Sequence, residues 1–561
     1  MREWVDTSAA ALALAQEAAD SPADERPLIL VVGGGPIGLE AAASCRYAGF
    51  HVTLAEQGDQ IASSVRAWSH VRLFTQNSLN NSPDGLRALE DLGWALPAPK
   101  ACPTGAEFAD NYLEPLARWL AEDADVLLST RVDSISRGSL LKGEGIKGAG
   151  DHSRDRTPFR ALLVSADGEE TVLEDLAAVI DCSGTFGNGN FIGRGGAPAV
   201  GERRLRAEPL PSRDRLGKAR DHFFDGIPDV LHADVASFLP RAGSRHRTVA
   251  IVGGGYSAAT TIHNLLDLAA SRSHTFAIEV EWLLRKPFAA GPPYLELEDD
   301  LLPSRHKLVT MANHVATSHE GAGGGFGPTP PVRVHRGVSI SQVHRDAEGR
   351  LVLKGVRERP PSSPSAQAAV ATGAPAASPA AAPAEGTKPA ETAEVATDLK
   401  PDLDLEPFEI RVDTLVSQVG YRPSYDLASE LQVHLCYASE GPMKLASSLL
   451  AARVAAQASG DASAAGDCLK QAPPGPELLT TPEPHFYVLG SKSYGRASSF
   501  LLSIGHKQVE AVVGMLKDEL LGAPTADGAA ADNGAAKAPR EAVATHPETS
   551  SAEPEGEAPA S

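Results

Sequence analysis

Mainly apolar runs alternate with alanine-rich, helix-like stretches over most of the chain. The apolar runs are residues 28–32, 51–55, 248–252 and 277–284. Runs of about four to eight apolar residues bounded by turns are typical of strands buried on both faces, as in a parallel sheet. In both halves the first run leads into a Gly-rich turn and a helix-like stretch, which ends near residue 48 and near residue 270. The sequence therefore predicts two β-α-β units.

A second pattern also occurs twice, in which alternating segments precede a strand and a Gly turn. The segments are 161–166 and 171–173 before 178–184, and 333–343 and 350–355 before 415–421. Alternation of apolar and polar residues predicts strands with one buried face, so we expect two short antiparallel meanders. The polar insert before residue 407 would then be an enlarged hairpin loop, which is tolerated because closure entropy grows only logarithmically with loop length.

The first Gly turn has a GxGxxG pattern between a strand and a helix. Its residues are Gly33, Gly35, Pro36 and Gly38. In this motif the glycines allow a tight turn, a close approach of the backbone to a pyrophosphate, and packing of the helix on the strand. Glu56 ends the next strand, 18 residues after Gly38, where a carboxylate accepts hydrogen bonds from ribose hydroxyls. We therefore expect FAD or NAD at this turn, rather than a dinucleotide with a 2′-phosphate.

The second Gly turn differs at the positions that bear on its ligand. It carries Gly253, Gly255, Ser257 and Ala258, with Ala258 at the third glycine position. The strand that follows ends in Arg285 and Lys286, where the first unit has Glu56. A cationic pair at the ribose end of the site favours the 2′-phosphate of NADPH. A solvated basic strand end without a ligand is the alternative interpretation.

With these motifs the chain resembles the two-dinucleotide-binding-domain flavoproteins, in particular the flavin-containing and N-hydroxylating monooxygenases. The resemblance is carried by residues 33–38, the Gly-x-Ser-Ala turn at 255–258, the GYRP sequence at 420–423, and the strand and Gly turn at 486–494. It covers residues 28–355 and 407–521, and the run 68–74 also resembles bacterial FAD-dependent oxidoreductases. The resemblance implies FAD at the first turn and NADPH at the second. It also implies that Gly184, Gly420, Gly490 and Ser491 bind cofactor.

One motif of that family is incomplete in this chain. The monooxygenases usually carry FxGxxxHxxx(Y/W) before the second Gly turn. Here Phe224 and Gly226 are followed by His232, two residues too late, and Phe238 lies near the position of the terminal aromatic residue. Oxygen chemistry is therefore less firmly indicated than flavin reduction.

The five Cys residues contain no CxxC or CxxxxC pair, which argues against a zinc ribbon and against a dithiol reductase.

The resulting fold class is α/β, with two Rossmann-like domains and the NADPH domain inserted in the FAD domain. The expected boundaries are an N-terminal extension 1–26, the FAD domain at 27–215 and 407–521, the NADPH domain at 216–355, an insert at 356–406 and a tail at 522–561. The insert and the tail consist mostly of small and polar residues. Such segments bury too little apolar surface to offset their ordering entropy, so both are expected to be disordered.

A polar stretch after the second strand supplies the candidate catalytic residues. It runs from Arg66 to Asn81 and is rich in Arg, His and amide side chains. In this fold such a stretch commonly runs beside the flavin ring, where Arg66, Asn80 and Asn81 would hydrogen-bond the ring. His70 is a candidate acid or base. The alternative is a polar surface loop with a structural histidine.

Composition adds limits on partners and location. The 561 residues include 51 Lys and Arg against 72 Asp and Glu, a net charge of −21, which argues against general binding to nucleic acid or anionic membranes. Residues 361–406 and 523–561 each contribute −5 of this charge. No apolar run approaches the roughly 18 residues of a membrane span, and the acidic N-terminal segment differs from a secretory or mitochondrial signal. We therefore expect a cytoplasmic protein without a membrane span. No metal-ligand cluster and no oligomeric state follow from the sequence.

The function expected from these features is that of an NADPH-dependent FAD oxidoreductase. The leading hypothesis is a monooxygenase-like enzyme that uses O2 on a small nucleophilic substrate. Two alternatives stay open: a reductase that passes electrons to an acceptor without oxygen insertion, and a non-catalytic flavoprotein that senses NADPH.

Overall fold

The computed structural model describes ten stretches of the chain. They are residues 25–146, 151–207, 222–240, 243–272, 276–287, 291–297, 299–318, 332–359, 404–458 and 468–522. The N-terminal extension, the insert and the tail expected from composition lie almost wholly outside these residues, so their predicted disorder stays a prediction.

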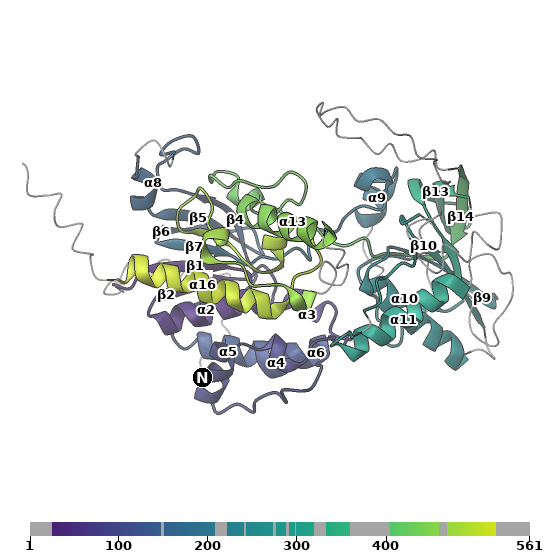
Figure 1. Ribbon diagram of the computed structural model, residues 1–561, viewed down its shortest axis with the longest axis horizontal. Coiled ribbons are helices and arrows are strands. Elements are labelled where there is room, and N and C mark those ends of the chain that lie inside the picture. Colours follow the sequence, from purple (N-terminus) through teal and green to yellow (C-terminus); the bar gives the residue numbers. More distant parts are fainter. Residues whose placement is uncertain are drawn as a thin grey trace, which may run out of the picture.

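Five parallel strands form the first sheet, in the order β16-β7-β1-β2-β3. The strands are β1 (Leu28–Val32), β2 (His51–Ala55), β3 (Asp125–Leu127), β7 (Ala178–Asp181) and β16 (Phe486–Val488). As the apolar pattern predicts, β1 is central and is buried on both faces. One face packs on α2 (Pro36–Ala48) and α16 (Leu502–Leu520), which lie side by side in Figure 1.

The other face of this sheet packs on an antiparallel meander. It consists of β4 (Thr130–Ser136), β5 (Phe159–Ser165) and β6 (Glu170–Leu176). Alternate residues of these strands, such as Phe159, Ala161 and Leu163, point into the core that they share with β1, β7 and β16. The predicted antiparallel segments 161–166 and 171–173 are confirmed as β5 and β6, whereas β4 was not among the predicted strands.

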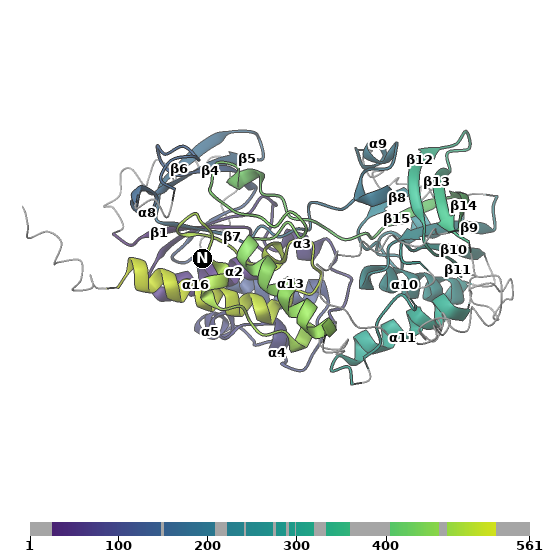
Figure 2. The ribbon, with the colours of Figure 1, turned by 45° about the horizontal axis from the view of Figure 1, so that its top comes forward.

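The second sheet repeats this arrangement, in the order β11-β10-β9-β15-β8, with all strands parallel. Its strands are β8 (His222–Asp225), β9 (His246–Val252), β10 (Ala277–Leu283), β11 (Val332–His335) and β15 (Thr414–Ser417). Helices α10 (Tyr256–Arg272) and α11 (Pro303–Ser318) pack on one face. The meander β12 (Ser339–Arg345), β13 (Leu351–Glu358) and β14 (Leu405–Val412) packs on the other (Figure 2).

These strands correct two expectations. The segment 333–343 is not one strand of the meander, because its first part is β11 of the parallel sheet and its second part is β12. The boundary at residue 407 is also wrong, because β14 and β15 pair with β13 and β9 and so belong to the second unit. The insert joins β13 to β14, which are antiparallel neighbours, so its predicted place in a hairpin connection is confirmed.

The second unit is inserted between β7 and β16 of the first, and the two crossing segments lie side by side (Figure 2). Gly189 and Tyr421 form an antiparallel bridge. The Asn190 amide donates to the Gly420 carbonyl at 2.9 Å, and the Arg422 amide donates to the Asn188 carbonyl at 2.9 Å. The predicted insertion is thus confirmed, and the crossing segments form a short two-stranded ribbon.

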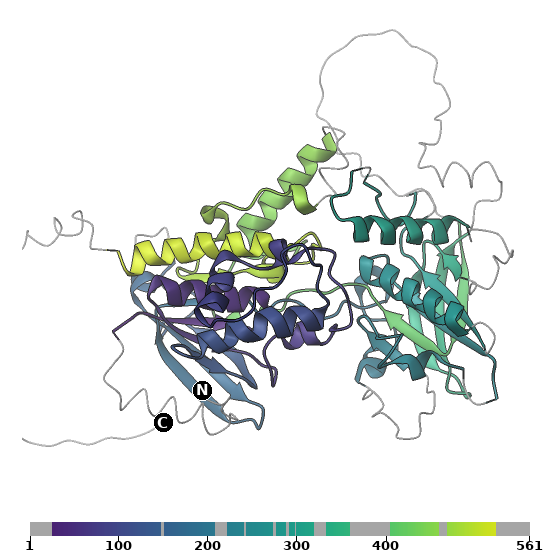
Figure 3. The ribbon, with the colours of Figure 1, turned by 90° about the horizontal axis from the view of Figure 1, so that it is seen from below.

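The remaining helices lie in the connections. In the first unit they are α3 (Ser63–Arg66), α4 (Asn77–Asn80), α5 (Pro83–Asp91), α6 (Gly105–Phe108), η1 (Ala109–Leu113), α7 (Glu114–Leu120), α8 (Ser153–Arg156), η5 (Asp426–Ala428), α13 (Met443–Ala458), η6 (Cys468–Lys470), α15 (Pro476–Leu479) and η7 (Gly490–Tyr494). Between the sheets and before β9 they are η2 (Arg194–Gly196), α9 (Glu202–Ala207) and η3 (Val235–Phe238). In Figure 3, α13 projects from the first unit. In the described part of the chain no helix is both long and apolar enough to span a membrane.

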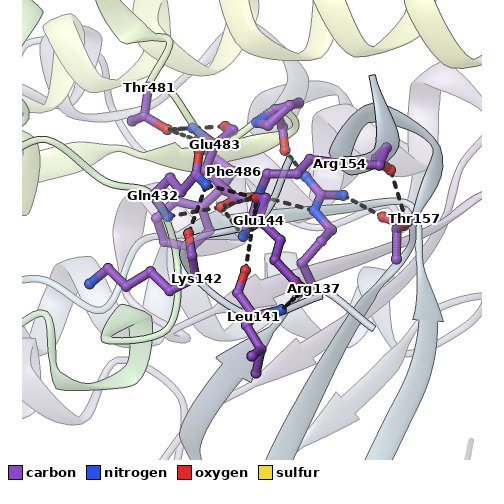
Figure 4. Close-up of polar contacts among 12 residues, drawn as sticks. Arg137, Leu141, Lys142, Glu144, Arg154, Thr157, Gln432, Thr481, Glu483 and Phe486 are labelled. Atoms are coloured by element: carbon purple, nitrogen blue, oxygen red, sulfur yellow. Dashed lines mark hydrogen bonds and ion pairs between the residues drawn. The ribbon is translucent and has the colours of Figure 1, made fainter. Parts of the chain in front are cut away.

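A buried ion-pair cluster fastens the connection between β4 and β5 to the start of β16 (Figure 4). Glu483 accepts from Arg137 Nε at 3.0 Å and from Arg154 Nη2 at 2.8 Å, and all three side chains are almost fully buried. Arg154 also donates to the carbonyls of Leu141 and Glu144. These contacts hold the described part of this connection, and they fix the N-terminal end of β16.

Candidate dinucleotide-binding sites

The first Gly turn has the conformation that the motif requires. Gly33 has φ +102°, and a Cβ there would lie 2.9 Å from the Cys182 carbonyl oxygen. A Cβ on Gly38 would lie 1.8 Å from the Gly33 carbonyl oxygen, so only glycine lets α2 pack this closely. No atom lies within 4 Å of a Cβ built on Gly35, the residue before α2. The helix N-terminus therefore faces open space, which fits a pyrophosphate bound by backbone amides.

Glu56 is buried at the end of β2 and holds the turn in place. Its Oε2 accepts from the Gly34 amide at 2.7 Å, and its Oε1 accepts from the Gly58 amide at 2.8 Å. Each carboxylate oxygen has two lone pairs, so both oxygens keep the capacity to accept from a ribose hydroxyl. The geometry fits the predicted role of Glu56.

Residues distant in sequence meet at the carboxyl ends of β1, β7 and β16. A Cβ on Gly184 would lie 3.7 Å from Ser491 Oγ, and a Cβ on Gly490 would lie 3.3 Å from Ile37 Cβ. Gly184 and Gly490 have φ of +71° and +73°. The structure thus brings three predicted segments, 33–38, 184 and 490–491, to one edge of the first sheet.

Two buried side chains at this edge are not among the residues expected from the sequence. Lys492 Nζ donates to Asp181 Oδ2 at 2.6 Å and to Ser183 Oγ at 2.8 Å, with both charged groups at most 1% exposed. Gln508, on α16, accepts from the Gly490 amide at 2.9 Å. Lys492 could have been suspected from its place directly after the Gly turn. Gln508 carries no such signal, because only the packing of α16 brings it there.

The N-termini of α2 and α16 lie together. A Cβ on Gly505 would lie 2.4 Å from Ile37 Cδ1. Both helices direct their positive ends toward the same edge, which favours a bound anion. Just before α16 begins at Leu502, the ring of Phe500 packs edge-on against Tyr494, with ring centroids 5.5 Å apart.

The predicted role of Arg66 is not supported by its contacts. Its Nη1 lies 2.7 Å from Asp110 Oδ1, its Nη2 lies 3.5 Å from Glu114 Oε2, and its Nε donates to the Ile61 carbonyl. The guanidinium thus ties α3 to η1 and α7. Its contribution to cofactor binding stays a prediction.

The two asparagine candidates have different environments. Asn80 exchanges hydrogen bonds with Thr75, donating to its carbonyl and accepting from its hydroxyl. Asn81 is only 7% exposed, and its Oδ1 has no hydrogen-bond partner among the described residues. A buried acceptor without a partner indicates a missing donor, such as a ligand or water. Asn81 therefore fits a ligand contact better than Asn80 does.

The predicted flavin loop also reaches the second unit. The ring of Phe74 packs edge-on against Tyr256 of the second Gly turn, with centroids 5.7 Å apart. His70 Nε2 is buried without a hydrogen-bond partner among the described residues. The pKa of Asp229, in the second unit, is lowered: burial would raise it, but hydrogen bonds from the Ala233 amide and His232 and the nearby His70 outweigh that effect.

The second Gly turn has the same geometry as the first. Gly253 has φ +139°, and a Cβ there would lie 2.2 Å from the Gln418 carbonyl oxygen. No atom lies within 4 Å of a Cβ on Gly255. Tyr294 Oη donates to the Gly255 carbonyl at 2.9 Å. Tyr294 therefore supports the turn on one side, and the space at Gly255 leaves the other side open. Ser257 and the buried Ala258 follow it in the first turn of α10.

Three cationic residues follow the carboxyl ends of β10 and β11. Arg285 is exposed. Lys286 donates to the Pro292 carbonyl, and burial and the nearby Arg336 lower its pKa. Arg336 is buried and donates to the Gly291 carbonyl at 3.0 Å. Of the predicted pair, Arg285 is therefore the better placed to meet a phosphate. Gly420, the remaining predicted residue, lies in the ribbon between the units.

Comparison with known proteins gives only distant similarity. No protein-family model matches the sequence, and no curated protein is detectably similar to it. Among solved structures, the chain is similar to bacillithiol disulfide reductase Bdr (YpdA) from Bacillus cereus, with 13% identity, a TM-score of 0.47 and coverage of 88% of this chain and 99% of that one.

Two other solved structures resemble the chain to a similar extent. Thioredoxin reductase from T. acidophilum has 12% identity and a TM-score of 0.41, over 87% of this chain and 98% of that one. A variant of a flavin monooxygenase from Stenotrophomonas maltophilia has 15% identity and a TM-score of 0.40, over 88% and 98%. Similarity at this level does not define an activity for this chain.

Proposed function

We propose that the protein is an NADPH-dependent FAD oxidoreductase. The observation that carries the proposal is the contrast between two open Gly turns of the same geometry. In the first unit the buried carboxylate of Glu56 directly follows the second strand, and in the second unit the exposed Arg285 lies two residues after it. This contrast matches a ribose with free hydroxyls in one site and a 2′-phosphate in the other.

The first site fits FAD on two observations, the open space at Gly35 and the unpartnered Oδ1 of Asn81. We assign the pyrophosphate to the amides at the start of α2, the adenosine ribose to Glu56, and the flavin end to the region of Gly490 and Asn81. FAD bound there would supply the capacity to accept a hydride from NADPH and to pass electrons on. The domain limits that follow are 25–207 with 418–522 for FAD, and 222–417 for NADPH.

The loop 67–81 connects the two sites. It follows α3, which starts beside the first Gly turn because the Ala62 amide before it donates to the Gly34 carbonyl, and it contacts Tyr256 through Phe74. Donor and acceptor must be held close and aligned for hydride transfer. We assign this loop the role of holding the nicotinamide end of the NADPH site against the flavin end of the FAD site.

The acceptor of the electrons is the less constrained part of the proposal. The leading assignment is O2 with a small nucleophilic substrate, such as an amine, a sulfide or an arsenical. A reductase without oxygen insertion is the second candidate, and the position of His232 favours it. This side chain is 79% exposed and pairs with Asp229, and it follows Gly226 two residues later than the histidine of the monooxygenase motif does.

Rapid mixing tests the proposal. The purified protein, reconstituted with FAD under anaerobic conditions, is mixed first with NADPH and then with oxygenated buffer, while flavin absorbance is recorded. We expect bleaching by NADPH. A transient species distinct from oxidised and reduced flavin would support a monooxygenase. Direct return to oxidised flavin would favour the reductase. Bound FAD that NADPH does not bleach would contradict the oxidoreductase and support a sensor.

A further inference from the structure

A buried polar cluster lies behind the turn at residues 80–82, where α2, α5 and η1 meet. Glu40, on α2, is 4% exposed, while Ser82 and Tyr112 are fully or almost fully buried. Ser82 Oγ donates to Glu40 Oε2, and the Ser82 amide donates to Tyr112 Oη at 2.9 Å. The function proposed above uses none of these three side chains.

Ser82 is the junction of this cluster. Its Oγ accepts from the Gly85 amide at 2.8 Å, which caps α5, and lies 3.3 Å from Tyr112 Oη. The hydroxyl has one proton to donate. When Glu40 is a carboxylate, that proton must point to Glu40. When Glu40 is protonated, its own O–H can donate to Ser82, and the hydroxyl proton is free to turn toward Tyr112.

Among the residues that the structure describes, the surroundings of Glu40 contain a second carboxylate and no cation in contact. Asp84, on α5, accepts from Ser44 Oγ at 2.7 Å. Tyr112 faces the cluster from η1, and α16 places Gly505 and apolar residues on the same core. Burial raises the pKa of Glu40 to about 7; the Ser82 hydrogen bond opposes this shift and Asp84 adds to it. Both protonation states are therefore populated near neutral pH.

We infer that Glu40 is a positioning residue for Asn81. Ser82 is joined to Asn81 through the chain, so the direction of its hydrogen bond sets the turn that presents the Asn81 carboxamide to the candidate flavin site. The two protonation states of Glu40 hold this turn differently, and FAD binding then depends on pH. The inference rests on the proposed FAD site and adds a pH-dependent control of it.

Two readouts test the inference. Infrared spectroscopy of the FAD-free protein detects the C=O stretch of a buried protonated carboxyl group, which we expect to disappear as the pH rises through about 7. The dissociation constant of FAD, measured by fluorescence, is expected to rise about fivefold between about pH 6 and pH 8, because the ionised group turns the Ser82 hydrogen bond.

Three variants separate the possible causes. Glu40→Gln is expected to lack the titrating band and the pH step in FAD affinity. Glu90→Gln, which removes an exposed carboxylate on α5, is the matched control and should retain both. Ser82→Ala keeps the Glu40 carboxyl but removes the junction, so the band should still titrate, at a higher pH, while the affinity step is lost.

The outcomes distinguish this inference from the proposed function. A wild-type protein that does not bind FAD would overturn the FAD site and with it the role of Glu40. If FAD binds normally but shows no step near pH 7, only the role of Glu40 is overturned. A step that persists in Ser82→Ala would show an effect of charge alone, and this too would overturn the positioning role.

Discussion

In the proposed function, single residues decide which ligand each Gly turn prefers. Glu56 directly follows the second strand of the first sheet, whereas Arg285 lies one residue beyond the equivalent position in the second unit, which Leu284 occupies. The carboxylate is anchored by two amides, whereas the guanidinium is exposed. The first is therefore built to accept from hydroxyls, and the second is available to a phosphate that arrives with the ligand.

The change Arg285→Ala tests this difference. A charge-assisted hydrogen bond to phosphate contributes about 1.5–3 kcal/mol, so we expect the KM for NADPH to rise about tenfold to a hundredfold. The KM for NADH should change less than about twofold. Steady-state kinetics with both nucleotides measures the effect. Arg160→Ala, at an exposed position of β5 in the other unit, is the control and should alter neither value. Equal losses for NADPH and NADH would refute the 2′-phosphate assignment.

At the scale of elements, helices and strands pack so closely around the Gly turns that some added side-chain atoms would clash. The start of α2 is the best example. A Cβ on Gly38 would clash with the Gly turn, whereas a Cβ on Gly35 would meet no atom within 4 Å. We therefore expect Gly38 to be needed for the packing of α2, and Gly35 to be needed for the proposed ligand.

This division predicts opposite effects for two matched substitutions. Gly38→Ala would place a Cβ 1.8 Å from the Gly33 carbonyl oxygen, and we expect a loss of stability of about 1–3 kcal/mol from overpacking. Gly35→Ala should leave the thermal unfolding of the FAD-free protein almost unchanged but weaken FAD binding more than about tenfold, because the backbone can no longer approach the pyrophosphate. Thermal melts and FAD titrations of both variants measure the contrast. Equal FAD affinity in Gly35→Ala and the wild type would contradict the site.

The ion-pair cluster around Glu483 makes a separate prediction about stability. Arg154→Met removes one guanidinium from an almost fully buried pair, and we expect the free energy of unfolding to fall by about 3 kcal/mol. Arg160→Met, in the exposed pair with Glu174, should cost less than about 1 kcal/mol. Urea unfolding followed by circular dichroism compares the two. Similar losses would mean that the buried cluster does not fasten β16.

At the scale of the whole molecule, the two units share one plan but are closed differently. The outer strand of the first sheet, β16, comes from the chain after the second unit, whereas the outer strand of the second sheet, β8, precedes its own Gly turn. The crossing ribbon and the contact of Phe74 with Tyr256 then join the units at separate places.

Phe74→Ala tests whether this contact serves catalysis. Misplacement of two reacting groups by about 1 Å can slow a reaction by about a hundredfold. We therefore expect flavin reduction by NADPH in stopped flow to slow by about tenfold or more, with FAD affinity unchanged. Trp94→Ala, at a partly exposed position in the 93–100 loop, is the control. Unchanged reduction in Phe74→Ala would rule out a role for the loop in aligning the two sites.

Local sequence by itself determined the repeated part of this protein. The central strands, the two Gly turns, α2, α10, and the acidic and basic strand ends follow from apolar runs, glycine spacing and charge, because these depend on residues close together in the chain. The meanders were predictable only in part. The alternating segments correspond to β5, β6, β12 and β13, but they include neither β4 nor β14, and alternation does not distinguish β11 from the strand that follows it.

Tertiary structure alone decided which distant residues meet. The pairing of β15 with β9 moved residues 405–417 into the second unit, and the packing of α16 on α2 brought Gln508 to the first site. The tertiary structure also distinguishes two neighbouring asparagines. Among the described residues, Asn81 Oδ1 has no hydrogen-bond partner, whereas Asn80 Oδ1 accepts from the Thr75 hydroxyl. Hydrogen-bond satisfaction and burial depend on contacts between segments far apart in the chain. For that reason the ligand preference of each turn could be predicted from the sequence, but the cluster of Glu40, Ser82 and Tyr112 could not.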